Sequence, residues 1–374
     1  MRNYIVKLKD EENSSKYNYL IRKTIISSGN KNTPLLGKSY PYGDLENIKQ
    51  INEVYINTSA QELKNVNNNK DIEEKWKVKI YAHVKKNINS FNIPLIKIPY
   101  DNILKRNSKN VLETLTDEIY LNPNIDIIVP PIIEFDDGDL KYLDILKIYE
   151  NIINTFIETI ESITGENKIA FFIPHYLSRT KIAHMLEFYV KQFGSDSLII
   201  VDINGLFEKS ASTIFFIMRK MRELKEESFS LYGFNQKPNK RSGISVPSQD
   251  FLAFTNGISY VGQSHVKSKL SKDILKTYKP EYKIFNESDL LYYPLAQGYP
   301  STNFKNWVGN KKISYEIVKR YNNKNTEIKT LELSNDANNF FGSITRNTFL
   351  NSLSKVGKKR DNTLKSRLLN DFGI

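Results

Sequence analysis

Residues 125–265 repeat one structural unit, and this repeat limits the possible folds more than any other feature of the sequence. Each unit has a short apolar strand, a polar group where the strand ends, and a stretch with the apolar spacing of an amphipathic helix. Strands that alternate with helices in this way are typical of a parallel sheet covered by helices. The predicted strands are Ile125–Val129, Lys168–Ile173, Ser197–Val201, Ser228–Gly233 and Ile258–Val261.

The residues that follow these strands carry side chains able to bind a ligand or take part in a reaction. In parallel sheets, and above all in (β/α)₈ barrels, ligands bind at the C-terminal ends of the strands. We therefore expect the strand ends to form the rim of one site, although they do not name its ligand. The polar groups lie at Glu134–Asp137, Pro174–Tyr176, Asp202–Gly205, Asn235–Lys237 and Gly262–His265.

The segments outside the repeat complete the predicted architecture. Tyr4–Leu8 and Tyr19–Ile26 have strand patterns on either side of a polar turn, which predicts a small N-terminal β-hairpin. We predict an α/β fold in which residues 1–265 form a TIM-type (β/α)₈ barrel with this hairpin. Residues 266–374 are predicted to form a basic, mainly helical C-terminal extension. That extension could also complete the barrel with its last strand and helix.

The chain has a net charge of +12 and an isoelectric point of about 9.3. These values favour a polyanionic partner, with nucleic acid first and an acidic membrane surface second. The alternative is a lysine-rich proteome, since Lys, Asn and Ile are abundant along the whole chain. The positive charge is unevenly distributed, so we predict DNA or tRNA as the partner. The sequence leaves the oligomeric state open, and a homodimer is compatible with it.

The chain contains no cysteine, which excludes disulfides, zinc–thiolate sites and cysteine-bound iron–sulfur clusters. No run of 18 apolar residues predicts a membrane span, and the N-terminus has the pattern of a strand rather than of a signal peptide. We therefore expect a cytoplasmic protein without a membrane partner. No metal-ligand spacing and no glycine-rich phosphate loop are found, so neither a metal nor a cofactor is predicted.

Asp202 and His175 are the candidate catalytic residues. A carboxylate at the end of a barrel strand is well placed to act as a nucleophile or a general base. Asp202 could instead cap the helix that follows it. His175 comes after a strand and a proline, where it could transfer protons or bind the edge of a base, or could have only a structural role.

The candidate substrate-binding residues are amides and one further histidine at the strand ends. Amide side chains donate and accept hydrogen bonds, which suits them to the edge of a heterocycle. Each is weak evidence in a chain so rich in asparagine. The set consists of Asn204, Asn235, Gln236, Gln263 and His265.

Two basic segments are candidate nucleic-acid contacts. One is a loop at the end of the sheet that carries the predicted site, and the other lies in the C-terminal tail. Lysine and arginine side chains in such positions bind phosphates, although a run of charge is often only a solvated face. The residues are Lys237, Lys240, Arg241, Lys358, Lys359 and Arg360.

Three short motifs resemble those of the tRNA-guanine transglycosylases, including relatives that place deazaguanine bases in DNA. The N-terminal hairpin of that family ends in Gly-x-x-x-Thr-Pro, and this chain has Gly29–Pro34 (GNKNTP). A family strand carries Gly/Ser-x-Asp-Ile, and here Asn124–Ile127 (NIDI) is found. A late family strand has Gly-Ile/Val-Asp-x-Phe-Asp, and here Gly257–Gly262 (GISYVG) is found. The resemblance covers roughly residues 2–265 and implies a (β/α)₈ barrel that exchanges bases in nucleic acid.

The chain departs from that family at its catalytic positions. The nucleophilic aspartate of the family would fall at Gly262, which has no side chain to react. The Asp-Ser-Gly-Gly-Phe-Gln loop is absent, and only Asp101 could stand in for its aspartate. The zinc-binding cysteines of the family cannot exist here. The resemblance therefore implies the fold more strongly than the usual catalysis, and whether the chain is an enzyme stays open.

Three functions are compatible with the sequence. The first is a nucleic-acid-associated, transglycosylase-like transferase with a base-binding pocket at the C-terminal ends of the strands. The second is a non-catalytic nucleic-acid-binding or scaffold protein on the same fold. The third is a barrel enzyme that acts on a small anionic metabolite.

Overall fold

The chain has a mixed α/β fold with parallel sheets, as predicted. The N-terminal hairpin is confirmed: β1 (Ile5–Ser14) pairs antiparallel with β2 (Tyr19–Ser28), which also pairs with β3 (Lys31–Asn32). The computed structural model describes residues 4–39, 51–85, 90–136, 138, 144–165, 168–194, 196–225, 228–239, 243–265, 281–295, 302–345 and 347–371.

The first parallel sheet contains the last four of the five strands predicted in the repeat. Its order is β4-β12-β10-β9-β8, and every neighbouring pair is parallel. All the residues of β8 and most of those of β9 and β10 are buried, which explains their nearly continuous apolar sequences. The strands are β4 (Gly37–Lys38), β12 (Tyr260–Val261), β10 (Ser230–Gln236), β9 (Leu198–Gly205) and β8 (Phe171–Ile173).

A second parallel sheet has the order β5-β6-β7. Its strands are β5 (Ile51–Asn57), β6 (Phe91–Pro99) and β7 (Ile132–Glu134). An isolated parallel bridge between Ser39 and Ile51 links the first sheet to β5. At the other edge, the amide of Ala170 donates a hydrogen bond of 2.7 Å to the carbonyl of Ile128.

The strand predicted at Ile125–Val129 was placed too early. The structure has β7 at Ile132–Glu134, and residues 125–131 are not part of a strand. The segment nevertheless runs beside β6, because the amide of Asp126 donates to the carbonyl of Asn92. Pro130 and Pro131 have no N–H to donate, which interrupts a regular ladder at this place.

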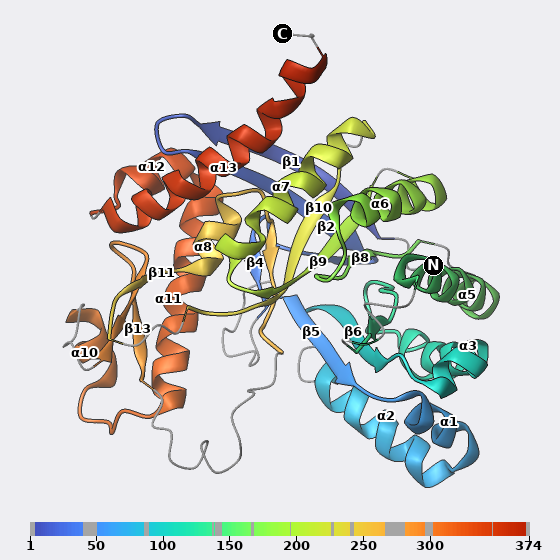
Figure 1. Ribbon diagram of the computed structural model, residues 1–374. Coiled ribbons are helices and arrows are strands. Elements are labelled where there is room, and N and C mark those ends of the chain that lie inside the picture. The colour runs from blue at the N-terminus through green and yellow to red at the C-terminus, as the bar shows by residue number, and fades with distance from the viewer. Residues whose placement is uncertain are drawn as a thin grey trace.

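Helices connect the parallel strands and lie on the outside of the sheets (Figure 1). The long helix α5 begins at Ile145, after the capping residue Asp144, whose carboxylate accepts from the amide of Lys147. It ends at Gly165, where φ is 68°, a conformation that favours glycine. The helices of this region are α1 (Ala60–Asn68), α2 (Lys70–Lys85), α3 (Asn102–Leu115), the π-helix η1 (Thr116–Tyr120), α5 (Ile145–Thr164), α6 (Arg179–Phe193), α7 (Phe207–Glu223) and α8 (Gln249–Phe254).

The C-terminal part adds a small antiparallel sheet and further helices. The sheet has the order β11-β14-β13, with β11 (Val246–Pro247), β14 (Leu291–Pro294) and β13 (Lys283–Asn286). Since β11 belongs to this sheet, the predicted boundary at residue 265 separates strands that pair with each other. The helices are α10 (Thr302–Val308), α11 (Tyr315–Asn335), α12 (Ala337–Gly342) and α13 (Asn347–Asp371), and α13 packs on α7 and β2.

The hairpin covers the N-terminal ends of the strands in the first sheet. The Tyr4 hydroxyl donates 2.9 Å to the carbonyl of Ile169, just before β8, and the Tyr260 hydroxyl at the start of β12 donates 2.6 Å to the carbonyl of Thr24. In Figure 1 the hairpin lies at the top, and the arrow of β5 points away from it. The C-terminal strand ends therefore lie at the end of the sheets opposite the hairpin. Within the described residues, no helix is long and apolar enough to span a membrane.

Candidate active site

Asp202 and His175, the two predicted catalytic residues, are in direct contact. Asp202 lies on β9 and His175 follows β8, which is the neighbouring strand of the same parallel sheet. Their Oδ2 and Nδ1 atoms are 2.6 Å apart. Asp202 is 8% exposed, whereas the His175 side chain is 42% exposed. A buried carboxylate thus holds a histidine ring that remains accessible at the end of the sheet.

Asn204 completes this group, because its Nδ2 lies 2.9 Å from Nε2 of His175. An ionised carboxylate only accepts hydrogen bonds, so Nδ1 of the neutral ring carries the proton that faces Asp202. Nε2 is then the unprotonated nitrogen and accepts from the Asn204 amide. The arrangement of carboxylate, histidine and unprotonated ring nitrogen is that of a general base.

The backbone at the ends of β9 and β10 departs from regular strand geometry. Asn204 and Asn235 have φ values of 43° and 59°, a left-handed conformation that costs free energy for a residue with a side chain. The register between the two strands also shifts in this region, where Gln236 pairs with Gly205. Such irregularities turn side chains at the ends of strands toward functional sites.

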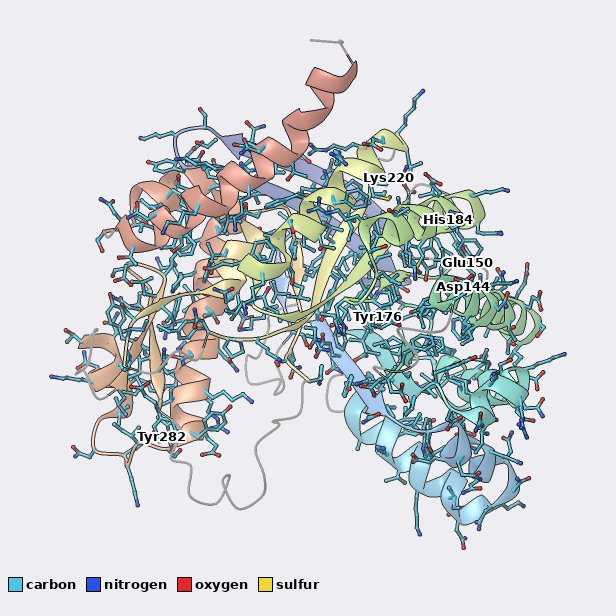
Figure 2. The ribbon with its side chains drawn as sticks, in the orientation of Figure 1. Asp144, Glu150, Tyr176, His184, Lys220 and Tyr282 are labelled. Carbon is cyan, nitrogen blue, oxygen red and sulfur yellow. The ribbon has the colours of Figure 1, made fainter. Side chains whose placement is uncertain are left out.

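Aromatic rings lie close to the pair formed by Asp202 and His175. Its Oδ1 atom is buried and has no hydrogen-bond partner among the described residues. Burial raises the pKa of the Tyr176 phenol, and the negative charge of Asp202 contributes to that rise. The Tyr176 ring lies near His175 and Phe135, with centroid distances of 5.5 and 5.8 Å. Figure 2 shows Tyr176 near the middle of the molecule.

A second hydrogen-bonded group surrounds Glu53, a residue that we did not predict as part of the site. Glu53 lies on β5 and is 5% exposed. Its carboxylate accepts from the Tyr232 hydroxyl at 2.7 Å and from the backbone amide of Gln263 at 3.0 Å, and it lies 2.7 Å from Nε2 of His265. The only sequence signal was a charged residue inside the apolar segment Ile51–Ile56.

Tyr55 stacks on His265, with ring centroids 3.9 Å apart and planes inclined by 14°. Burial raises the pKa of the Tyr55 phenol to about 12, and nearby negative charges add to the rise. These charges belong to Glu134, Asp202 and Glu53. The ends of both parallel sheets therefore contribute to one region around Tyr55, which the sequence did not single out.

The predicted amides are found at the strand ends, and all four bind other parts of the protein. Asn235 Oδ1 accepts from the backbone amide of His265 at 2.9 Å, and Gln263 Nε2 donates to Ser39 Oγ at 3.1 Å. Gln236 is 4% exposed and donates 2.9 Å to Asp250. These contacts position the loop and strand ends, whereas the Asn204 side chain contacts His175 and the His265 side chain contacts Glu53.

The structure shows the contacts of the two residues that stand at catalytic positions of the resembling family. Asp101 caps α3, where its Oδ1 accepts from the amides of Ile103 and Leu104 at 2.9 and 2.8 Å. Gly262 lies against Glu53, and a Cβ atom at this position would overlap Glu53 Oε1. The absence of a side chain at residue 262 therefore leaves room for the carboxylate of Glu53.

Residues from both of the predicted basic segments line one cleft. A cleft of about 290 Å³ lies between the loop around Ser245 and α13, and Lys355 and Lys359 line it. Lys358 is exposed and Lys237 is half-buried. Arg360 is 4% exposed and its guanidinium lies beside Asp361 and Asn256, which leaves little of it accessible to a phosphate. Lys240 and Arg241 lie outside the described residues.

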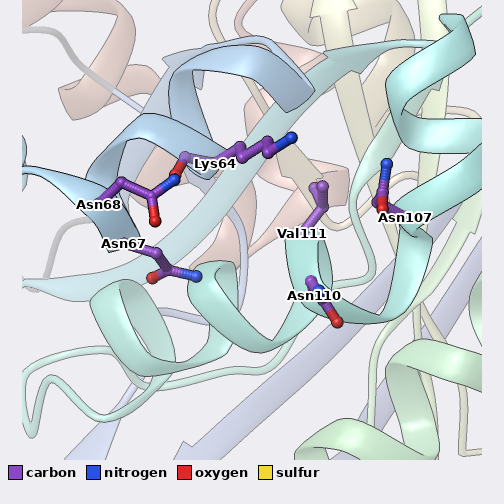
Figure 3. Close-up of a pocket in the computed structure, with 6 residues that line it drawn as sticks. All are labelled: Lys64, Asn67, Asn68, Asn107, Asn110 and Val111. Atoms are coloured by element: carbon purple, nitrogen blue, oxygen red, sulfur yellow. The ribbon is translucent and has the colours of Figure 1, made fainter.

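A hollow of about 140 Å³ between α1 and α3 includes none of the strand-end residues (Figure 3). Across the ranges that the structure describes, no group of three or more histidine, aspartate or glutamate side chains could hold a metal ion. The hollow is lined by Lys64, Asn67, Asn68, Asn107, Asn110 and Val111.

No protein-family model matches the chain, and no curated protein matches it significantly.

Proposed function

We propose that the chain is a nucleic-acid-associated, transglycosylase-like enzyme of the cytoplasm that exchanges a base at a sugar carbon. The contact between Asp202 and His175 carries this proposal. It joins a buried carboxylate to an accessible histidine at the C-terminal ends of parallel strands, where enzymes of this architecture bind their substrates.

We also propose that the two parallel sheets form one (β/α)₈ barrel. The bridge between Ser39 and Ile51 joins β5 to the strand segment that begins with β4. The hydrogen bond from Ala170 to Ile128 joins the segment before β8 to the segment before β7. Because these links connect both edges of one sheet to both edges of the other, they support a closed ring.

Base exchange needs two kinds of group, and the site offers both. The bond between the sugar and the outgoing base breaks with positive charge developing on the sugar, which a nearby carboxylate stabilises. The outgoing base gains a proton and the incoming base loses one, which a positioned histidine can transfer. Asp202 supplies the negative charge, with Oδ1 uncommitted among the described residues, and His175 supplies the ring nitrogen.

The nucleic-acid part of the proposal rests on charge. The net charge of +12 and the cleft lined by Lys355 and Lys359 would attract the phosphate backbone. A base inside a duplex cannot reach a pocket at the strand ends, so the target nucleotide would have to leave its stack. Single-stranded segments or loops meet this requirement at the lowest cost.

The test is a base-exchange assay with labelled guanine or deazaguanine on tRNA, duplex DNA and single-stranded DNA. The wild-type chain should exchange base into one of these, and Asp202→Asn should abolish turnover while nucleic-acid affinity is kept. Glu150→Gln is the matched control, because Glu150 faces His184 across α5 and α6 at 3.5 Å, outside the site (Figure 2). Unchanged turnover in Asp202→Asn would refute the assignment of Asp202.

A non-catalytic nucleic-acid-binding or scaffold protein is the second candidate, and Gly262 is the observation that favours it. At this position the resembling family has its nucleophilic aspartate, whereas here Glu53 fills the space and is itself fully hydrogen-bonded. That function predicts tight, salt-dependent binding without exchange. An enzyme for a small anionic metabolite is less compatible, since Glu134, Asp202 and Glu53 together give the region around Tyr55 a negative charge.

A further inference from the structure

The structure contains a second pair of a buried carboxylate and a histidine, formed by Glu53 and His265. Placing an ionised carboxylate inside a protein costs free energy unless donors surround it. Glu53 has three such partners, namely the Tyr232 hydroxyl, the backbone amide of Gln263 and Nε2 of His265. This set is complete enough to keep Glu53 in one position, so Glu53 can orient the imidazole.

The hydrogen bond to Glu53 determines which nitrogen of His265 carries the proton. An ionised carboxylate only accepts, so Nε2 of the neutral ring is protonated and Nδ1 is not. Nδ1 makes no hydrogen bond to any described residue. His175 has the opposite arrangement, with its proton on Nδ1 facing Asp202. The two histidines therefore present different unprotonated nitrogens, Nε2 of His175 and Nδ1 of His265.

Aromatic contacts fix the plane of the His265 ring. Tyr55 stacks on it at 3.9 Å, and the Phe234 ring lies 5.6 Å away at an angle of 29°. The His265 side chain is only 16% exposed. A ring that is stacked, hydrogen-bonded on one nitrogen and nearly buried is preorganised for contact through its other nitrogen.

Both pairs belong to the same region. Phe234, whose ring lies 5.6 Å from that of His265, pairs in register with Asp202 on the neighbouring strand. The contact between Glu53 and His265 requires a glycine at residue 262, because any side chain there would displace the carboxylate of Glu53. The glycine at residue 262 thus leaves the space that the Glu53 carboxylate occupies.

We propose that His265 is a second proton-transfer residue of this site and that Glu53 is its positioning residue. The proposal rests on the base exchange proposed above. When the outgoing base leaves, the C–N bond breaks, its electron pair goes to the base, and one histidine, which starts this step with both ring nitrogens protonated, gives that base a proton. When the incoming base forms its new C–N bond, the N–H proton goes to the other histidine. The first histidine ends neutral and the second ends protonated, and each ring then exchanges one proton with the solvent to restore the starting state.

The first test is a nitrogen-15 NMR spectrum of the full chain labelled at its four histidines. Spectra of His175→Gln and His265→Gln assign the two signals. At a pH where the rings are neutral, we expect the proton of His175 on Nδ1 and that of His265 on Nε2. A proton on Nδ1 of His265 would overturn the proposal, because the nitrogen available to a substrate would then already be protonated.

The second test compares turnover in the base-exchange assay. His265→Gln should lower the exchange rate by about 100-fold or more, as is usual for the loss of an acid–base group, and should bind nucleic acid as the wild type does. Glu53→Gln should lower it by about 10- to 100-fold, as for a residue that orients another. His184→Gln is the matched control, since that ring is exposed on α6 and should leave the rate unchanged.

The outcomes of these tests distinguish the proposed role of His265 from the proposed function of base exchange. If the wild type shows no exchange on any nucleic acid, the proposed function is overturned, and this proposal with it. If the wild type exchanges base and His265→Gln does so at the same rate, only the role of His265 is overturned. Should Glu53→Gln fail to fold, His265→Gln and the wild-type spectrum still decide the question.

Discussion

The two ends of the parallel strands differ in how their polar groups are used. At the N-terminal ends, hydroxyl groups pair with the hairpin: Ser230 with Thr24 at 2.7 Å, and Tyr260 with Thr33 at 2.7 Å. At the C-terminal ends, Asp202 Oδ1 is without a partner among the described residues, and His175 is accessible. Buried polar groups are normally satisfied, so Asp202 Oδ1 is a candidate for contact with a ligand. The comparison separates polar residues that hold the fold from those that are available for chemistry.

The largest expected effect is at the C-terminal end. His175→Gln should lower the rate of base exchange by about 100-fold or more, because it removes the unprotonated nitrogen that Asp202 orients. The midpoint of thermal unfolding should change little, since the ring is partly exposed. Turnover assays and thermal melts measure the two quantities. An equal loss of rate in the surface variant His184→Gln would contradict the distinction between these histidines.

Glu327 on α11 tests whether an unsatisfied buried group always marks a ligand site. Its Oε2 is without a partner among the described residues, and burial raises the pKa of its carboxyl to about 7. Between pH 4.5 and 7 the folded chain keeps a proton that the unfolded chain has lost, so the free energy of unfolding falls as the pH rises through this window. Glu327→Gln removes this pH-dependent fall in the free energy of unfolding. It should therefore stabilise the protein above pH 7 by on the order of 2–3 kcal/mol.

Urea unfolding at several pH values measures this effect, with the exposed Glu332→Gln as the control on the same helix. Base exchange should be the same in the wild type and both variants. An identical pH dependence in wild type and Glu327→Gln would show that this carboxyl is not held neutral by burial. Loss of exchange in Glu327→Gln would mean that the C-terminal part contributes to the site.

Tyr260→Phe tests the N-terminal end. The hydroxyl bonds the carbonyl of Thr24 and the hydroxyl of Thr33, both buried, and its removal leaves them without that partner. We expect a loss of about 1–3 kcal/mol in the free energy of unfolding, with an unchanged rate of exchange per folded molecule. The exposed Tyr315→Phe is the control. A loss of activity without loss of stability would show that this end also takes part in function.

The smallest effect is expected from the cleft beside α13. Replacing Lys355 and Lys359 by Gln should weaken nucleic-acid binding and make the slope of log K against log salt less negative, by about 0.7–0.9 for each phosphate that is no longer neutralised. The exposed pair Lys311 and Lys312, replaced in the same way, controls for the change in net charge. Binding titrations at several salt concentrations measure the slopes. Equal slopes in both double variants would assign the effect to overall charge.

Much of the fold followed from local pattern. The buried strands β8, β9 and β10 were evident as apolar runs, and the hairpin as alternation around a polar turn. The strand near residue 125 was misplaced because apolar character continues through Pro130 and Pro131 into β7. The antiparallel pairing of Val246 with Tyr292 was not predicted, since it joins short strands far apart in the chain.

The sequence by itself determined which residue types lie at the strand ends, because parallel strands expose their C-terminal residues at one edge. It therefore identified Asp202, His175 and Asn204, which the structure brings together. Only the tertiary structure showed that Glu53 lies beside His265, 212 residues further along the chain, and that Arg360 is buried. The physical reason is that strand patterns are local, whereas the partner of a side chain depends on how distant strands and helices pack.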